Sequence, residues 1–346
     1  MARDLLTVTD SGLYCEAGGF YVDPWRPVER AVITHGHSDH ARYGMRRYLS
    51  SPEGECVLRL RLGPMAKIDI LEYGETLEIF GVKVSLHPAG HILGSAQVRI
   101  EHKGQVWVVS GDYKTEPDRT CKAFEPLRCD VFVTESTFGL PIYRWPGEQL
   151  VFDQINAWWR RNQQAGQCSI IYGYALGKAQ RILSGLDPTI GPIFCHGAVQ
   201  NLNGAYRACG VELPPTKTTS EVPRGYDWSS AIVVAPPNAH ATPWMRKFGD
   251  SVTAFCSGWM AIRGARRRRA IDRGFVLSDH VDWPTLLGAI DATGAERIWV
   301  THGYSAIVAQ YLGERGLQAE VVPTRFEGEL EEGPEGEERD ASAEGA

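Results

Sequence analysis

Six short apolar stretches of this chain each lead into a histidine, an aspartate or a glutamate, and this repetition constrains the fold more than any other feature. Short apolar stretches rich in β-branched residues are typical of buried strands. Ligands of α/β folds gather beyond the strand ends of a sheet, so the pattern predicts an α/β fold with one shared polar site. The polar positions are His35 to His40, His91, Asp112, Glu135, His280 and His302.

The densest of these segments is Thr34–His40, which holds three histidines and an aspartate directly after the apolar stretch Arg30–Ile33. Three imidazoles and a carboxylate packed so closely would leave hydrogen-bonding groups unsatisfied unless a cation organised them. Imidazole and carboxylate together suit zinc, manganese or iron, whereas calcium prefers a cage of oxygens. The segment therefore predicts a metal site, to which the other polar positions would add ligands.

Taken in order along the chain, these motifs resemble the metallo-β-lactamase superfamily, and within it the β-CASP nucleases, which process nucleic acids. The matching motifs are HxHxDH, a downstream Gly-His, Ser-Gly-Asp, Thr-Glu-Ser-Thr, Ser-Asp-His and Thr-His-Gly. Three further stretches are similar to the bacterial ligase-associated DNA exonucleases, namely Gly12–Pro27, Ser257–Met260 and Arg263–Arg269. The resemblance implies an αββα sandwich with an inserted α/β domain.

The resemblance also implies a site for two divalent transition-metal ions, zinc or manganese, that share an activated hydroxide. The ligands of one ion would be His35, His37 and His91. The ligands of the other would be Asp39, His40 and His302. Asp112 would bridge the two ions, and Asp39 and Asp112 would count among the catalytic residues. Asp23 would orient a ligand histidine, although an aspartate before Pro24 is equally consistent with an ordinary turn.

His280 and Glu135 would form the proton-donating pair of this site. A histidine that acts as a general acid near neutral pH needs a carboxylate partner to raise its pKa. Glu135 is the partner that the resemblance implies, and Asp282 competes for the role. His302 leaves the substrate open, because the Artemis-type DNA-repair enzymes usually carry valine at this position and the RNA-processing members carry histidine.

Length and composition predict two domains and a tail. The 346 residues are 43% hydrophobic, enough for a substantial core. We expect residues 1–145 and 270–326 to form the catalytic domain and residues 146–269 the insertion. Residues 327–346 hold nine acidic residues and one arginine, so we expect a disordered acidic tail, and the remaining chain carries a net charge of +2. In the insertion we expect helices at 149–164 and 178–186 and strands at 169–173, 192–196, 231–235 and 252–257.

The cellular setting follows from what the sequence lacks. It contains no apolar run long enough to span a membrane, and Met1–Asp10 does not resemble a signal peptide. Its eight cysteines are scattered without CxxC pairs, which favours small core residues in a reducing compartment. We therefore expect a cytoplasmic protein without a membrane partner.

Basic residues of the insertion are candidates for nucleic-acid binding. Guanidinium groups bind backbone phosphates well, and Lys178 follows a glycine-rich strand end where backbone amides could bind a phosphate. A solvated surface or an ordinary helix cap are the alternatives. The candidate residues are Arg263, Arg266, Arg267, Arg268, Arg269 and Lys178.

These observations predict a two-metal phosphodiesterase, specifically a DNA exonuclease acting in repair with a DNA ligase and a helicase as partners. An RNA-processing nuclease of the same branch, endo- or exonucleolytic, is the alternative. A small-molecule hydrolase of the same fold is disfavoured, because lactam or thioester hydrolysis would need neither the insertion and its arginines nor His280 with Glu135. A non-catalytic binding module is disfavoured further, since no ligand is missing.

Overall fold

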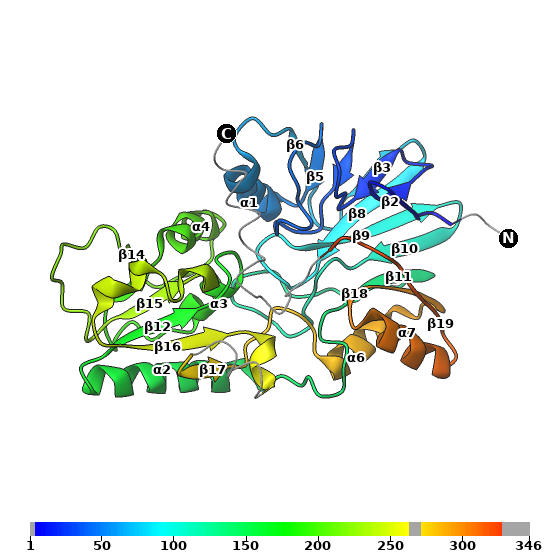
Figure 1. Ribbon diagram of the computed structural model, residues 1–346. Helices are drawn as coiled ribbons and strands as arrows, with labels where there is room; N and C mark the ends of the chain where they lie inside the picture. The colour runs from blue at the N-terminus through cyan, green and yellow to red at the C-terminus, as the bar shows by residue number, and fades with distance from the viewer. Residues whose placement is uncertain (1–3, 263–270, 327–346) are drawn as a thin grey trace. The chain divides into compact units, whose positions relative to one another are not determined.

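The computed structural model describes residues 4–262 and 271–326, which divide into two compact units. Within the described residues, one unit comprises 4–144 and 279–326, and the other comprises 145–262 and 271–278. The chain thus leaves the first unit, builds the second, and returns (Figure 1). None of the helices in the described ranges is both long and apolar enough to cross a lipid bilayer.

The first unit contains a six-stranded sheet, sheet A, with the strand order β1-β2-β3-β4-β5-β6. Its first three strands are antiparallel and its last three neighbouring pairs are parallel. Helix α1 (Pro52–Leu62) packs on it through Leu58, which joins Ala31 and Tyr48 in one apolar cluster. The strands are β1 (Thr7–Thr9), β2 (Gly12–Cys15), β3 (Phe20–Val22), β4 (Ala31–Val32), β5 (Tyr48–Ser50) and β6 (Ile68–Ile70).

Sheet B, also in the first unit, has seven strands in the order β19-β18-β11-β10-β9-β8-β7. The pairs from β19 to β10 are parallel, and those from β10 to β7 are antiparallel. Helices α6 (Trp283–Thr293) and α7 (Ser305–Glu314) cover one face. The strands are β7 (Thr76–Ile79), β8 (Val82–Pro88), β9 (Ala96–His102), β10 (Gln105–Val109), β11 (Val131–Ser136), β18 (Arg297–Gly303) and β19 (Gln318–Val321).

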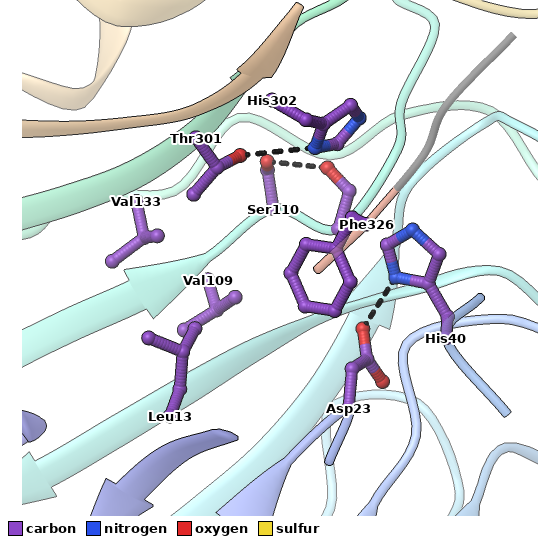
Figure 2. A pocket seen from close by; sticks show the side chains of 10 residues that line it. Leu13, Asp23, His40, Val109, Ser110, Val133, Thr301, His302 and Phe326 are labelled. Atoms are coloured by element: carbon purple, nitrogen blue, oxygen red, sulfur yellow. Dashed lines mark hydrogen bonds and ion pairs between the residues drawn. The ribbon is translucent and has the colours of Figure 1, made fainter. Parts of the chain in front are cut away.

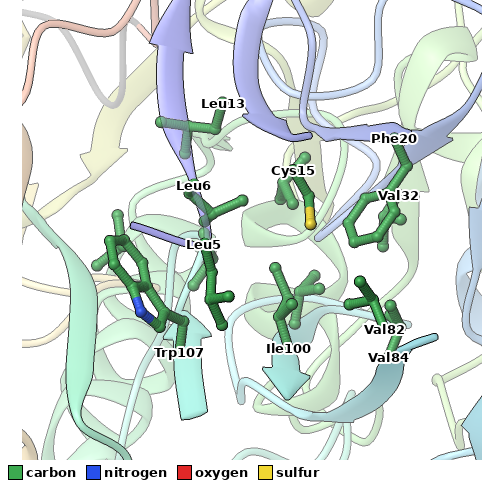
Figure 3. Close-up of a cluster of buried hydrophobic side chains, with 14 of the residues drawn as sticks. Leu5, Leu6, Leu13, Cys15, Phe20, Val32, Val82, Val84, Ile100 and Trp107 are labelled. Atoms are coloured by element: carbon green, nitrogen blue, oxygen red, sulfur yellow. The ribbon is translucent and has the colours of Figure 1, made fainter. Parts of the chain in front are cut away.

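Successive residues of the central strands of sheet B face different apolar layers. In β11, Val131 and Val133 join the core between the two sheets, whereas Phe132 joins the layer under α6 and α7. This alternation follows from the two-residue period of a strand, and burial on both faces explains why these strands read as continuous apolar runs. In the core between the sheets, side chains of sheet A meet Val82, Val84, Ile100 and Trp107 of sheet B (Figure 3). The layers are therefore α, β, β, α, as expected.

The second unit is built on a parallel sheet, sheet C, with the order β14-β13-β15-β12-β16-β17. Its core joins the sheet to apolar residues of α2, α3 and α4. The strands are β12 (Cys168–Tyr172), β13 (Ile193–Cys195), β14 (Lys217–Thr218), β15 (Ile232–Ala235), β16 (Ser251–Cys256) and β17 (Arg273–Phe275). The helices are α2 (Glu148–Gln164), α3 (Lys178–Ser184) and α4 (Gly197–Ala208), with short 3₁₀ helices at Pro237–Ala239, Pro243–Phe248 and Gly258–Ala261.

The expected elements of this unit lie within two residues of the observed ones, but its second boundary differs from the expected position. We expected the chain to return to the first unit at residue 270, whereas the division falls after Ser278. The reason is β17, which pairs in parallel with β16 and so extends sheet C. The apolar run before His280 is therefore not a strand of the sheets that carry the other polar positions.

Candidate metal centre

The candidate residues of the centre come together within the first unit, at the ends of strands from both sheets. His35 to His40 follow β4 of sheet A, and His91 and Asp112 follow β8 and β10 of sheet B. Glu135 and His302 are near the ends of β11 and β18, and His280 lies in the segment before α6. Because β11 and β18 are parallel neighbours, Glu135 and His302 reach the same edge of sheet B.

Two glycines shape the turns that carry His91 and Asp112. Gly90 has a φ of 74°, and a Cβ there would collide with the carbonyl oxygen of Lys114. Gly111 has a φ of 57°, and a Cβ would lie 2.6 Å from the side chain of Thr34. Glycine alone adopts such conformations at little cost and leaves room for this approach, so Gly90 lets the turn before His91 pack on the backbone of Lys114, and Gly111 lets the turn before Asp112 pack on Thr34.

Four side chains place their ligand atoms within 4.8 Å of one another: His35, His37, His91 and Asp112. His37 Nδ1 lies 3.1 Å from His35 Nε2 and 3.2 Å from His91 Nε2. Asp112 Oδ2 lies 3.6 Å from His35 Nε2 and 3.8 Å from His91 Nε2. Three imidazole nitrogens and a carboxylate oxygen that converge in this way could hold a divalent metal ion. We call His35, His37 and His91 the first set.

The second set consists of Asp39, His40 and His302, and it also converges on Asp112. His302 Nε2 lies 3.1 Å from Asp112 Oδ1, and His40 Nε2 lies 3.7 Å from Asp112 Oδ2 and 3.5 Å from Asp39 Oδ2. His40 Nε2, His302 Nε2 and Asp112 Oδ1 are buried and have no hydrogen-bond partner of good geometry among the described residues. Buried polar atoms are nearly always satisfied, so these three atoms fit a second cation.

The Nδ1 atoms of four histidines are held by neighbours, which leaves each Nε2 directed at the site. His40 Nδ1 lies 2.8 Å from Asp23 Oδ2, and His91 Nδ1 donates to the carbonyl oxygen of Asp279 at 2.8 Å. His35 Nδ1 lies 3.1 Å from Thr34 Oγ1, and His302 Nδ1 lies 3.2 Å from Thr301 Oγ1. Partners of this kind fix the tautomer and ring orientation of metal ligands. Asp279 and the two threonines were not anticipated, because their roles depend on backbone position and side-chain rotamer.

Asp23 links two strands of sheet A to the centre. Besides contacting His40, it accepts hydrogen bonds from the backbone amide of Thr34, at 2.8 Å, and from the Thr34 hydroxyl. The side chain is buried, and its φ of 43° lies in the left-handed region, which aspartate tolerates better than most residues. The backbone bends at this residue, and its side chain makes the contact to His40 that Figure 2 shows.

Burial and neighbouring charges shift the pKa values of the clustered histidines in different directions. Burial lowers the pKa of His35 and of His91 well below 6.5, and the neighbouring imidazoles lower both further. Burial also acts to lower the pKa of His40, but the Asp39, Asp112 and Asp23 carboxylates outweigh it and raise that pKa to about 10. Burial acts to raise the pKa of Asp112, but His40 and His302 outweigh it and lower that pKa. Without a metal, His35 and His91 are thus neutral, the form that binds metals, whereas His40 is held charged beside the carboxylates.

His280 and Glu135 form a buried pair next to the first set. His280 Nδ1 lies 2.8 Å and 3.0 Å from the two oxygens of Glu135, and the amide of Tyr113 donates to Glu135 Oε1 at 2.9 Å. Asp112, Glu135 and His280 also converge closely enough to hold an ion. Both Glu135 oxygens already contact His280, however, which describes a carboxylate–imidazole pair better than a metal site. Asp282, the competing partner, caps α6 by accepting from the amide of Thr285 at 3.1 Å.

One aromatic residue at the centre was not anticipated. The ring of Phe326 stacks on His40, with centroids 4.3 Å apart and planes at 15°. It also meets His302 edge-on at 5.9 Å and Trp25 at 6.0 Å. Figure 2 shows the pocket that Phe326, His40 and His302 line together. A single apolar residue between Arg325 and Glu327 carries no periodic signal, so the sequence gives no reason to select it.

The predicted nucleic-acid contacts of the insertion receive no support. Arg263 and Arg266 to Arg269 lie outside the described residues. Lys178 is fully buried in the first turn of α3, and a phosphate contact there stays a prediction.

Comparisons with known proteins agree with the expected fold. The chain is 31% identical over 312 residues to a protein named "Probable DNA ligase" from Opitutus terrae, a match that covers 89% of this chain. It is 36% identical over 125 residues to Endoribonuclease YSH1 of Yarrowia lipolytica, and 35% identical over 127 residues to Cleavage and polyadenylation specificity factor 73 of Drosophila melanogaster. The chain belongs to the β-CASP branch of the metallo-β-lactamase superfamily.

This β-CASP chain spans only part of those relatives. The matches cover 30% of the Opitutus protein, 15% of the Yarrowia protein and 18% of the Drosophila protein. A solved structure of a protein of unknown function from Enterococcus faecalis V583 superposes with a TM-score of 0.59 at 12% identity, covering 86% of this chain and 80% of that one. This likeness concerns the fold alone. No family model matches the sequence.

Proposed function

We propose that this protein is a metal-dependent nuclease that hydrolyses phosphodiester bonds, and specifically a DNA exonuclease that acts in repair with a DNA ligase. The observation that carries the proposal is Asp112, whose carboxylate lies within 3.8 Å of nitrogen atoms from both sets of candidate ligands. The two sets would each hold one divalent transition-metal ion, zinc or manganese. When bound, such a pair activates water and neutralises negative charge on a phosphodiester.

The protein's own residues would supply orientation and a proton. Asp23 and the carbonyl oxygen of Asp279 hold the His40 and His91 rings, so that ligand geometry is set before substrate arrives. Glu135 accepts from His280 Nδ1, which leaves Nε2 as the atom that would donate a proton to the leaving oxygen. Such a donor suits phosphodiesters, whose leaving alkoxide is strongly basic.

The ligase partner and the DNA substrate have one line of support each. A sequence similar to nearly the whole chain forms about a third of a protein named as a probable DNA ligase, so nuclease and ligase sequences would occur together there. Three stretches resemble ligase-associated DNA exonucleases, although the arginines of one lie outside the described residues.

A second candidate is an RNA-processing nuclease. Two relatives carry names of RNA-processing proteins, an endoribonuclease and a cleavage and polyadenylation factor. His302 favours this candidate as well, because its Nε2 points at Asp112 in the manner of a ligand rather than away from the centre.

Matched substrates distinguish the two candidates. DNA and RNA strands of the same sequence, each labelled at either end, are incubated with the protein and manganese or zinc. We expect linear DNA to be shortened from an end, while closed circular DNA and RNA persist much longer. Faster attack on RNA, or internal cuts in circular DNA at a similar rate, would replace the DNA exonuclease with the RNA-processing or endonuclease activity.

A further inference from the structure

Residues 322–326, which we call the strap, run from β19 back to the metal centre. The strap begins beside sheet B, where the amide of Val322 donates to the carbonyl oxygen of Val300 at 2.9 Å. It ends at Phe326, whose side chain is only 9% exposed. Arg42, two residues after His40, donates to the carbonyl oxygen of Arg325 at 3.4 Å. The strap is thus joined both to β18, which carries His302, and to the loop that carries His40.

Phe326 contacts two histidines of the second set, His40 and His302. Its ring is nearly parallel to that of His40 and perpendicular to that of His302, at 15° and 86°. Trp25 supports the ring from a third direction, at an interplanar angle of 76°, and its own position is fixed by a bond from Nε1 to the carbonyl oxygen of Asp10 at 2.8 Å. The ring is therefore held by a rigid neighbour rather than resting loosely on the imidazoles.

We propose that Phe326 is a positioning residue that sets the affinity of the second set for its metal ion, an inference that rests on the proposed two-metal function. A hydrogen bond between Asp23 and His40 Nδ1 fixes the imidazole at one atom but leaves the ring free to rock about that bond. A stacked ring resists this rocking, because aromatic pairs prefer defined offset geometries. Nε2 then stays aimed at Asp39 and Asp112.

Phe326 also removes water from this half of the centre. An apolar shell around a metal site controls solvent access and the local dielectric, and charges attract one another more strongly where the dielectric is low. The Phe326 ring covers His40 and His302, whereas His91 of the first set is supported by the carbonyl oxygen of Asp279. Loss of the ring should therefore weaken binding of the ion at the second set far more than binding of the ion at the first set.

Manganese binding measured on the full-length protein tests the inference. Metal-free wild type, Phe326→Ala and Phe326→Tyr are titrated with Mn²⁺, and free manganese is counted by electron paramagnetic resonance. We expect wild type to bind two ions. Phe326→Ala should keep the first and bind the second about 10- to 100-fold more weakly, the usual effect of losing an outer support of a ligand. Phe326→Tyr, which keeps the ring, should restore the second affinity.

Two further variants locate the effect. His302→Ala removes a ligand of the second set, so it should weaken the same one of the two manganese-binding steps that Phe326→Ala weakens. Arg325→Ala changes an exposed side chain of the strap, whose contact to Arg42 uses only the backbone, and it should bind both ions like wild type. Thermal denaturation of each metal-free variant confirms that it is folded.

Any of three results would overturn the inference. They are that Phe326→Ala binds both ions as tightly as wild type, that it loses both affinities equally, or that it loses the first ion instead of the second. If wild type itself binds no manganese, the proposed function fails and takes this inference with it. If wild type binds two ions and Phe326→Ala does the same, only the role of Phe326 fails.

Discussion

At the scale of single residues, Asp112 connects the two halves of the centre, because its carboxylate faces nitrogen atoms of both ligand sets. Asp112→Asn should therefore lower the occupancy of both sites and abolish activity. Elemental analysis of purified protein should find close to two transition-metal ions per wild-type chain and fewer in the variant. Asp291→Asn, an exposed carboxylate on α6, is the control and should behave as wild type. One ion in both wild type and Asp112→Asn would contradict a dinuclear centre.

His280 is a second single residue with a predicted role, which is to donate a proton rather than to bind a metal ion. His280→Ala should keep both ions and lose roughly 10²- to 10⁴-fold in rate, the range for general acid catalysis. The loss should shrink on a nitrophenyl phosphodiester, whose leaving group needs no proton, and Glu135→Gln should show the same dependence on leaving group. An equal loss on both substrates would mean that His280 positions the metal ligands or the substrate instead.

At the scale of elements, the turn after β10 brings Asp112 against the loop after β4, and Gly111 makes this approach possible. Gly111→Ala should cost more stability than the about 1–2 kcal/mol of a left-handed alanine, because its Cβ also meets Thr34, and it should weaken metal binding. Gly104→Ala is a matched control in the β9–β10 turn, with a φ of 80° and no atom within 4 Å of the added Cβ. Urea denaturation of the metal-free proteins, followed by metal titration, compares the two; equal costs would show that the Thr34 contact is unimportant.

The strands also show which parts of the fold and of the centre could be predicted from the sequence. Strand ends followed by polar residues were recognisable because burial on both faces makes the strands apolar, so the residues that gather at the centre could be selected before the structure. Sheet membership could not be read in the same way. The apolar run before His280 looks like the others, yet β17 pairs with β16 in sheet C. Phe326 and the burial of Lys178 depend on long-range packing, which leaves no local pattern.

At the scale of the whole molecule, the buried histidines make stability depend on pH in both directions. The pKa values of His35 and His91 are lowered on folding, so the unfolded chain binds more protons below pH 6.5, and stability is lost as pH falls below that value. The pKa of His40 is raised to about 10, so its contribution is present below pH 6.5 and is lost as pH rises from there to about 10. Metal-free protein should therefore be most stable near pH 6.5.

Thermal denaturation in a chelator from pH 5 to pH 9 checks this dependence. The acid side should be the steeper one, since two histidines act there and one acts on the alkaline side. Metal ions should deepen the loss on the acid side, because protons compete with metals for the same nitrogens. A melting temperature that rises steadily up to pH 9 in the absence of metal would contradict the charges assigned to His40.

The candidate residues of the centre are far apart in the sequence. The first ones directly follow β4, the last one lies in β18, and the whole second unit is placed between them in the chain. A growing polypeptide therefore cannot bring both ligand sets together until residue 302 has emerged from the ribosome. Domains generally fold as units during synthesis, so the parallel sheet of the second unit could be complete while Asp39 and His40 still await His302. Loading of the second set would then be a late event, governed by the ions that the chain encounters after residue 302 has been made rather than by those present when the first set is complete.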